Sequence, residues 1–332
     1  MLCKRPQIYP NISKTVPLPC GYCLPCRIAK RRIWTHRMML EAGTHEHNSF
    51  LTLTYDDVNL PQEFHHKKTG QVYADNSLNP YHIHTFINSI RKRFERSGRQ
   101  PFRYYCCGEY GDKNHRPHYH LALFGVPTCV GTGPRWCGRV YVPCSCPNCL
   151  EISSVWKKGN IYLGTLTQHS AQYICGYVTK KLTSDDNDKN IRYRSEKGLL
   201  LNFRHPEFAR MSRKPHGLGY DAAVEFGKKI APFVKSIDDI PPFLVHNGRK
   251  WFLGSYLFNV VRSQTCVPED LEGEALTRYE KTLHTLFEGK TLTLPQEKAL
   301  KAGLPDVALK MLNAQRVLQI EKKQQRSKKR GL

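Results

Sequence analysis

The sequence predicts an α+β fold in which helices pack on an antiparallel sheet of about five strands. Three observations predict it. Short segments rich in β-branched and aromatic residues are typical of strands, and amphipathic segments with helical spacing are typical of helices. Along the chain these segments follow the order strand, helix, strand, strand, strand, helix, which favours helices on one face of an antiparallel sheet.

Two helices and a strand are predicted in the first hundred residues. Residues 27–42 form a basic helical pattern, and residues 50–55 (FLTLTY) alternate in the manner of a strand. Pro80 begins a helical pattern that runs to about Arg96 and places its apolar side chains on one face.

The middle of the chain predicts a hairpin, a cysteine-rich loop, a strand and a helix. Residues 102–108 and 118–124 predict two strands, because a turn-rich segment separates two β-forming runs. A Gly- and Pro-rich loop with five cysteines covers about 126–150. Residues 160–166 then predict a short strand, and residues 168–182 predict a helix.

Composition shifts divide the chain into three parts. They are a basic N-terminal segment with a cysteine cluster (1–45), a central domain with its cysteine-rich insertion (46–225, insertion 126–150) and an accessory C-terminal region (226–332). Within the last part residues 295–325 predict a helix, and the chain ends in a basic tail.

The charge of the chain predicts a polyanionic partner. The 332 residues include 51 Lys plus Arg and 28 Asp plus Glu, a formal net charge of +23, which points to nucleic acid. A hydrophobic fraction of 40% and an aromatic fraction of 11% exclude a mostly disordered chain. We find no apolar stretch of membrane-spanning length and no secretory signal, and we expect the protein in the cytoplasm.

Two histidines on the second strand of the hairpin are candidate metal ligands. His118 and His120 are two residues apart, so on a strand both imidazoles face the same side. Glu109, at the end of the partner strand, is the carboxylate best placed to join them. Two imidazoles and one carboxylate suit Mn²⁺ or Mg²⁺ that polarises a phosphate oxygen. The alternative is a hairpin with two surface histidines.

A second pair with the same spacing, His82 and His84, begins a predicted helix. Residues two apart on a helix diverge by ~200°, so we interpret this pair as structural.

A pair of tyrosines on the following helix is the candidate nucleophile. Tyr173 and Tyr177 are four residues apart and share a helix face, with Lys180 and Lys181 close to that face. A tyrosine phenol is a weak nucleophile while it keeps its proton, because its ordinary pKa is ~10, and a metal-activated phosphodiester and a nearby lysine both assist its attack. The alternative is an amphipathic helix with a packed aromatic pair.

A metal triad on a sheet and a tyrosine-bearing basic helix together are what site-specific DNA nicking requires. The chain resembles the replication initiation proteins of the microviruses, most closely those of the gokushovirus type, and through them the HUH (His-hydrophobe-His) rolling-circle endonucleases. The resemblance covers about residues 20–225. It is carried by FLTLTYDDVNLP at 50–61, YYCCGEYGDKNHRPHYHLALFG at 104–125, SAQYICGYVTKK at 170–181 and SRKPHGLGYD at 212–221.

The resemblance implies an enzyme that nicks one strand of the phage origin. His118 and His120 would be the metal ligands, and Tyr173 and Tyr177 would be the nucleophiles. A phosphotyrosine would hold the 5′ phosphate and leave a free 3′-OH, and the ends would later be rejoined. Glu109 as third ligand remains an inference from geometry, and Lys180 from its place beside the tyrosines.

The first motif would contribute sheet packing and DNA contact through Thr52, Thr54 and Tyr55. The substrate would be single-stranded or replicative-form phage DNA in the cytoplasm of the bacterial host. We find no Walker-type phosphate loop, so a host helicase and a host DNA polymerase are the expected partners. Two features depart from the family. Tyr119 replaces the aliphatic residue between the histidines, with its ring expected on the other face of the sheet, and the cysteine-rich insertion is additional.

The clustered cysteines are candidate ligands of structural Zn²⁺. One set is Cys144, Cys146 and Cys149, completed by Cys137 or by Cys129, and the other is Cys20, Cys23 and Cys26, completed by Cys3 or a histidine. The alternative is that these residues are reduced thiols in loops.

Two basic helices are candidate phosphate contacts, one with Arg27 and Arg31 and the other over residues 91–99, and Lys181 adds a further candidate DNA contact. The alternative is solvated helix faces. Charge and cysteines alone would also fit a zinc-braced nucleic-acid-binding protein without catalysis. A related HUH enzyme of transposition or conjugation would differ only in its DNA substrate.

Overall fold

The computed structural model describes most of the chain as far as residue 265. The described residues are 3, 6, 19–21, 23–62, 64–65, 72–73, 75–111, 114–137, 140–181, 192–194, 200–246 and 248–265. They divide into two compact units, one of residues 34–223 and one that combines residues up to 33 with residues from 224 on. The helix expected at 295–325 and the basic tail lie outside the described residues.

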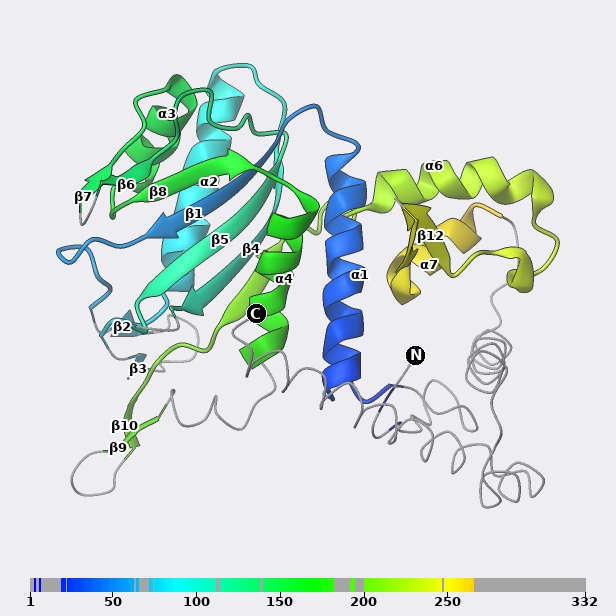
Figure 1. Ribbon diagram of the computed structural model, residues 1–332, viewed down its shortest axis with the longest axis horizontal. Helices are drawn as coiled ribbons and strands as arrows, with labels where there is room; N and C mark the ends of the chain where they lie inside the picture. The colour runs from blue at the N-terminus through cyan, green and yellow to red at the C-terminus, as the bar shows by residue number, and fades with distance from the viewer. Residues whose placement is uncertain are drawn as a thin grey trace. The chain divides into compact units, whose positions relative to one another are not determined.

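A five-stranded antiparallel sheet forms the centre of the larger unit (Figure 1). The strand order is β11-β4-β5-β1-β8, and each neighbouring pair is antiparallel. The five strands are β1 (Asn48–Thr54), β4 (Arg103–Tyr110), β5 (Pro117–Phe124), β8 (Ile161–Thr165) and β11 (Phe208–Met211). The predicted α+β class with about five strands is confirmed.

One face of the sheet is covered by the helix α2 (Pro80–Arg96). Asn79 caps this helix, since its side chain accepts a hydrogen bond from the N–H of Tyr81, and Pro80 occupies the first helical position. The apolar face of α2 packs on alternate residues of β1 and β5, among them Leu51 and Leu121, which are fully buried.

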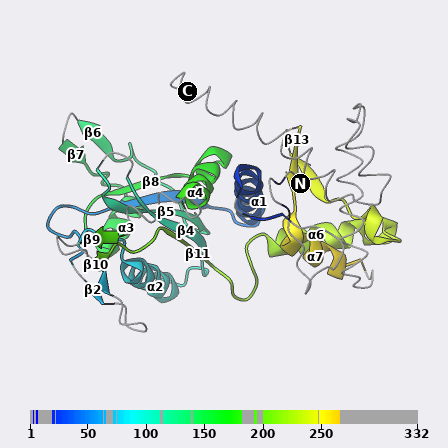
Figure 2. The same cartoon turned by 90° about the horizontal axis from the view of Figure 1, so that it is seen from below.

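The expectation that helices cover only one face was wrong. The helix α4 (Gln168–Lys181) and the end of α1 (Leu24–Ala42) pack on the other face, where Met38 and Ile174 meet Phe124 (Figure 2). The physical reason is the continuous apolar run of residues 121–124 on β5, which places buried side chains on both faces of the strand.

The cysteine-rich segment is not only a loop, as expected, but contains regular structure. The strands β6 (Arg135–Cys137) and β7 (Val140–Val142) form a small hairpin, and α3 (Pro147–Trp156) follows. The helix begins there because Cys146 takes the N-cap position, where its sulfur accepts from the N–H of Cys149, and Pro147 follows it.

Short strands form a further sheet with the order β2-β3-β10-β9. Their bounds are β2 (Phe64–His65), β3 (Val72–Tyr73), β9 (Arg192–Arg194) and β10 (Leu200–Phe203).

The smaller unit contains helices and one hairpin. Its elements are the first part of α1, most of α6 (Tyr220–Ile230), the 3₁₀ turns η1 (Ala231–Phe233) and η2 (Ile237–Asp239), β12 (Phe243–His246), β13 (Arg249–Phe252) and α7 (Gly254–Ser263). A small residue lets α6 approach α7 closely, since a Cβ on Gly227 would lie 2.9 Å from the carbonyl oxygen of Val261.

Tyr119, between the two histidines, joins the sheet to the N-terminus of α2. Its ring lies on the α2 face, as expected, and is fully buried. Its hydroxyl donates to the carbonyl of Asn79 at 3.0 Å and accepts from the N–H of Asn79 at 2.9 Å. The hydroxyl of Tyr55 lies 2.8 Å from that of Tyr119 and 2.8 Å from Nδ1 of His82. Burial lowers the pKa of His82 to about 4, so His82 is neutral in this network near neutral pH.

Replacing Tyr119 by Phe is expected to lower the free energy of unfolding by about 1–3 kcal/mol, because the buried N–H of Asn79 loses its acceptor. Urea unfolding of the full chain measures the change. Tyr104→Phe is the matched control, since the hydroxyl of Tyr104 makes no hydrogen bond within the described residues. Equal effects of the two substitutions would contradict the network.

Candidate active site

The register of three neighbouring strands brings the predicted triad together on the α4 face of the sheet. Glu109 on β4 lies directly opposite His118 on β5, and Thr52 on β1 lies opposite His120. The ligand atoms of Glu109, His118 and His120 all lie within 4.8 Å of one another. Because the register follows from the short hairpin, the sequence itself positions this site.

Hydrogen bonds aim both imidazoles at the carboxylate of Glu109. Its Oε1 lies 2.6 Å from Nε2 of His118 and 3.1 Å from Nε2 of His120. The opposite ring nitrogens have partners of their own. Nδ1 of His118 donates to the carbonyl of Arg116 at 3.1 Å, and Nδ1 of His120 lies 2.8 Å from Oγ1 of Thr52. Such partners fix ring orientation and leave Nε2 as the atom directed into the site.

The three groups shift one another's pKa. Burial acts to raise the pKa of Glu109, but the hydrogen bonds from His118 and His120 lower it below its usual value. Burial acts to lower the pKa of His118, but the carboxylate of Glu109 raises it overall. For His120 burial dominates and lowers the pKa despite the same carboxylate. The site therefore holds an ionised carboxylate between two imidazoles with different proton affinities.

These residues fit a divalent cation. Oε2 of Glu109 is buried and has no hydrogen-bond partner among the described residues, which is costly for a carboxylate that no cation neutralises. Ligand atoms bound at ~2.1 Å to one octahedral ion lie ~3–4 Å apart, close to the spacing of the triad. The donor set of two nitrogens and one carboxylate oxygen leaves further coordination positions for substrate oxygens.

Tyr173 on α4 lies beside the triad. Its ring centroid is 5.1 Å from that of His120 with an interplanar angle of 81°, and 6.3 Å from that of Phe50. The side chain is 41% exposed, so its hydroxyl is accessible from solvent. Lys180 and Lys181 stand at the end of α4, but the side chains of Tyr177, Lys180 and Lys181 lie outside the described part of the structure.

The residues of the first motif have structural contacts. Oγ1 of Thr52 orients His120, and Oγ1 of Thr54 donates to the carbonyl of Asn160 at 3.2 Å. Tyr55 is buried, and its hydroxyl belongs to the Tyr119 network. The expected DNA contact by Tyr55 was therefore wrong, because the side chain is part of the core. The role of Thr52 as a support for His120 could not be read from sequence spacing, because the two residues are far apart in the chain.

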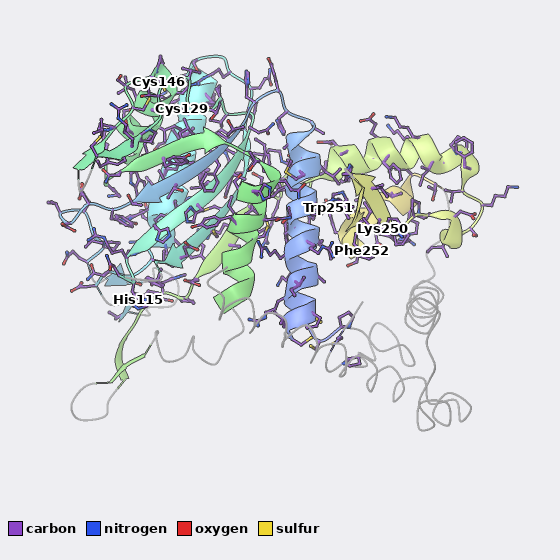
Figure 3. The ribbon with its side chains drawn as sticks, viewed as in Figure 1. His115, Cys129, Cys146, Lys250, Trp251 and Phe252 are labelled. Carbon is purple, nitrogen blue, oxygen red and sulfur yellow. The ribbon has the colours of Figure 1, made fainter. Side chains whose placement is uncertain are left out.

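Four cysteines of the cysteine-rich segment converge beside α3 (Figure 3). Sγ of Cys129 lies 3.6 Å from Sγ of Cys144 and 3.7 Å from Sγ of Cys146, and Cys149 completes the group. The fourth member is thus Cys129, and the expectation of Cys137 in this set is corrected. Cys137 is exposed on β6 and lies outside the group.

A second group of four cysteines lies at the N-terminal end of α1. Sγ of Cys23 lies 3.4 Å from Sγ of Cys26 and 4.0 Å from Sγ of Cys3, and Cys20 is the fourth member. Of the two alternatives for completing this set, the structure therefore brings in Cys3. In a tetrahedral zinc site with Zn–S bonds of ~2.3 Å the sulfurs lie ~3.8 Å apart, so both groups have the spacing of a zinc site.

Local backbone supports the first group. Burial acts to raise the pKa of Cys146, but hydrogen bonds from the backbone of Cys149 and Val130 lower it to about 6, which favours the thiolate that binds metal. A Cβ on Gly131 would lie 2.9 Å from Sγ of Cys144, so glycine is required where the loop passes the sulfur.

The basic helices carry both exposed and structural side chains. Arg31 on α1 is exposed, whereas Arg27 is half-buried. Within residues 91–99, Arg93 donates to Ser154 at 2.7 Å, and Arg99 pairs with Glu151, so these two arginines tie α2 to α3. Of the described helices, none is long and apolar enough to cross a membrane.

The fold and the site define an antiparallel-sheet protein with a two-histidine, one-carboxylate site beside a tyrosine-bearing helix. Sequence comparison confirms the resemblance to phage replication proteins. Residues 48–182 match the family model of the replication-associated proteins of the ORF2 type. The chain is 37% identical over 178 residues to Replication-associated protein ORF2 of Spiroplasma virus 4, which covers 51% of this chain and 50% of that protein.

Two further relatives have the same kind of name. The chain is 32% identical over 178 residues to Replication-associated protein VP4 of Bdellovibrio phage phiMH2K, covering 53% of this chain and 51% of that protein. It is 28% identical over 185 residues to Replication-associated protein ORF4 of Chlamydia phage 1, covering 54% and 43%. The chain spans about half the length of the curated relatives it matches. No solved structure matches.

Proposed function

We propose that this protein is a viral rolling-circle replication initiator. It nicks one DNA strand at the phage origin by tyrosine transesterification, stays on the 5′ phosphate and later rejoins the ends. The observation that carries the proposal is the position of the Tyr173 ring, 5.1 Å from the ring of His120 in a triad with the donor set of a divalent-cation site. The phage replication proteins to which the chain is similar support the biological setting.

The chemistry follows from these side chains. Nε2 of His118, Nε2 of His120 and the carboxylate of Glu109 would hold Mg²⁺ or Mn²⁺, which when bound polarises a phosphate oxygen. Oη of Tyr173 attacks phosphorus. The Oη–P bond forms and the P–O3′ bond breaks, while the phenol loses its proton and the 3′ oxygen gains one. The phosphotyrosine conserves the bond energy, so attack by a 3′-OH rejoins the ends without ATP.

Other residues would support this cycle. Tyr177 follows Tyr173 by one helical turn and would take the second transfer, and Lys180 would assist loss of the phenol proton. Arg27, Arg31, Thr54 and Lys181 would contact DNA, whereas Thr52 would position His120. Host helicase and DNA polymerase would unwind the duplex and extend the 3′-OH in the bacterial cytoplasm.

A cleavage assay tests the proposal. The full chain is incubated with single-stranded phage origin DNA and Mn²⁺ or Mg²⁺, resolved on a denaturing gel, and any adduct is mapped by mass spectrometry. We expect an adduct on Tyr173 or Tyr177 that EDTA abolishes and that the joint change of His118 and His120 to Ala removes. Tight binding without a nick or adduct, over several origin fragments and both metals, would instead support a zinc-braced binding protein without catalysis.

We further propose that each four-cysteine group holds one structural Zn²⁺. The sulfur spacings support this, as does the lowered pKa of Cys146. Neither group contains a catalytic side chain of the proposed reaction, so the ions would brace the segment before α3 and the N-terminus of α1.

Purified protein is expected to contain two zinc ions per chain, measured by elemental analysis with thiol quantification. Cys129→Ser is expected to remove one ion, because its sulfur belongs to the group beside α3. Cys137→Ser is the matched control and should retain both. Loss of zinc from the Cys137 variant but not from the Cys129 variant would contradict the assignment.

A further inference from the structure

The hairpin of β12 and β13 in the smaller unit has one buried face and one exposed face. Its register pairs Leu244 with Trp251 and Phe243 with Phe252. Trp251 is 6% exposed, whereas Phe252 is 46% exposed (Figure 3). The buried tryptophan anchors the hairpin, so the exposed phenylalanine is held on an ordered strand. A large ring kept at the surface in this way indicates a contact surface.

Basic side chains interleave with the apolar residues of the exposed face. Lys250 lies opposite Val245, which is 59% exposed. Nζ of Lys250 lies 4.6 Å from the ring centroid of Phe243, a cation–π contact that holds the ammonium group beside the aromatic pair. Arg249 begins β13 and is also exposed. Neither strand contains an acidic residue, so this face presents positive charge and aromatic surface together.

This combination selects one kind of partner. Bases in a duplex are stacked on one another, so an exposed protein ring cannot stack on them, whereas a single strand offers both base faces and phosphates. The chain carries a net charge of +23, which favours the same partner over a protein surface of mixed charge.

We propose that the face formed by Phe243, Val245, Lys250 and Phe252 is a binding site for single-stranded DNA. Phe252 stacks on a base, and Lys250 contacts a neighbouring phosphate. The site lies in a different unit from the triad and beyond residues 48–182, the segment that matches the replication family. It rests on the proposed function only in taking DNA as the substrate and does not require cleavage.

Binding of the full chain to a fluorescein-labelled oligo(dT) in EDTA tests this site without cleavage. Phe252→Ala is expected to weaken binding about tenfold, whereas Phe252→Trp keeps an aromatic ring and should retain it. Lys250→Ala should weaken binding and reduce the salt dependence by about 0.7 in log–log slope, because one phosphate contact is lost. Phe233→Ala is the matched control, since Phe233 is 78% exposed in the same unit but lies outside the hairpin.

Photocrosslinking to an oligonucleotide with 5-iododeoxyuridine identifies the contact directly and should label Phe252. Wild-type affinity of Phe252→Ala, or an equal loss for duplex DNA, would overturn the proposal. Crosslinks confined to other parts of the chain would also overturn it. The two proposals fail separately. Nicking with unaltered binding by Phe252→Ala removes the hairpin site alone, and Phe252-dependent binding without any nicking removes the initiator alone.

Discussion

Replacing Tyr173 by Phe is expected to abolish the covalent adduct at that residue and to slow the first cleavage of origin DNA at least about 1,000-fold. The substitution removes the attacking oxygen but keeps the ring that contacts His120 and Phe50, so the fold of the site is retained. Single-turnover cleavage of a labelled origin oligonucleotide, with the adduct resolved on a denaturing gel, measures the loss.

The other tyrosines near the site make this result specific. Tyr177→Phe is expected to leave the first cut intact and to impair rejoining, because Tyr177 would act in the second transfer. Tyr162 is the matched control, since it is 49% exposed and its ring contacts Phe50 on the same face of the sheet. Tyr162→Phe should cleave at nearly the wild-type rate. An adduct that persists in Tyr173→Phe and disappears in Tyr177→Phe would reverse the order of the two nucleophiles.

Replacing Glu109 by Gln is expected to reduce metal-dependent cleavage at least about 100-fold, because the site loses its only carboxylate while its shape is preserved. The concentration of Mn²⁺ needed for half-maximal cleavage should rise as well. Thr52→Val should weaken metal affinity about 10–100-fold without removing a ligand, because Thr52 only orients His120. Titration of Mn²⁺ against cleavage, together with direct Mn²⁺ binding by electron paramagnetic resonance, separates affinity from rate.

The chain contains an internal control for this result. His84 belongs to a His-x-His pair with the same spacing, but it is exposed on α2 and hydrogen-bonds to Asn88 at 3.0 Å. His84→Ala should bind Mn²⁺ and cleave like the wild type. If Glu109→Gln bound Mn²⁺ as tightly as the wild type, the triad would not be the metal site.

The sheet and the triad were predictable because both depend on short-range patterns. Alternation in residues 50–55 and 118–124 predicted two strands, and a spacing of two put His118 and His120 on one face. The turn between the strands of the hairpin then placed Glu109 opposite His118. No long-range information was needed for these three side chains to meet.

Other features depend on contacts that spacing does not encode. The choice of Cys129 over Cys137 follows from the path of an irregular loop past Gly131. Burial of Tyr55 follows from its pairing with Tyr119, which is distant in the chain. Likewise, the exposed Phe252 could be recognised only once the register of β12 and β13 showed which face Trp251 buries.

The proposed metal ligands differ from the edge of the sheet in contact order. Glu109, His118 and His120 belong to one hairpin, whose closure takes microseconds, whereas β11 reaches β4 only from residues 208–211. The ligand constellation can therefore assemble early in folding, before the distant edge strand has docked. A cation bound at that stage would bias the chain toward the correct pairing of β4 with β5, so the same ion that activates the phosphodiester would also guide the register of the strands that hold it.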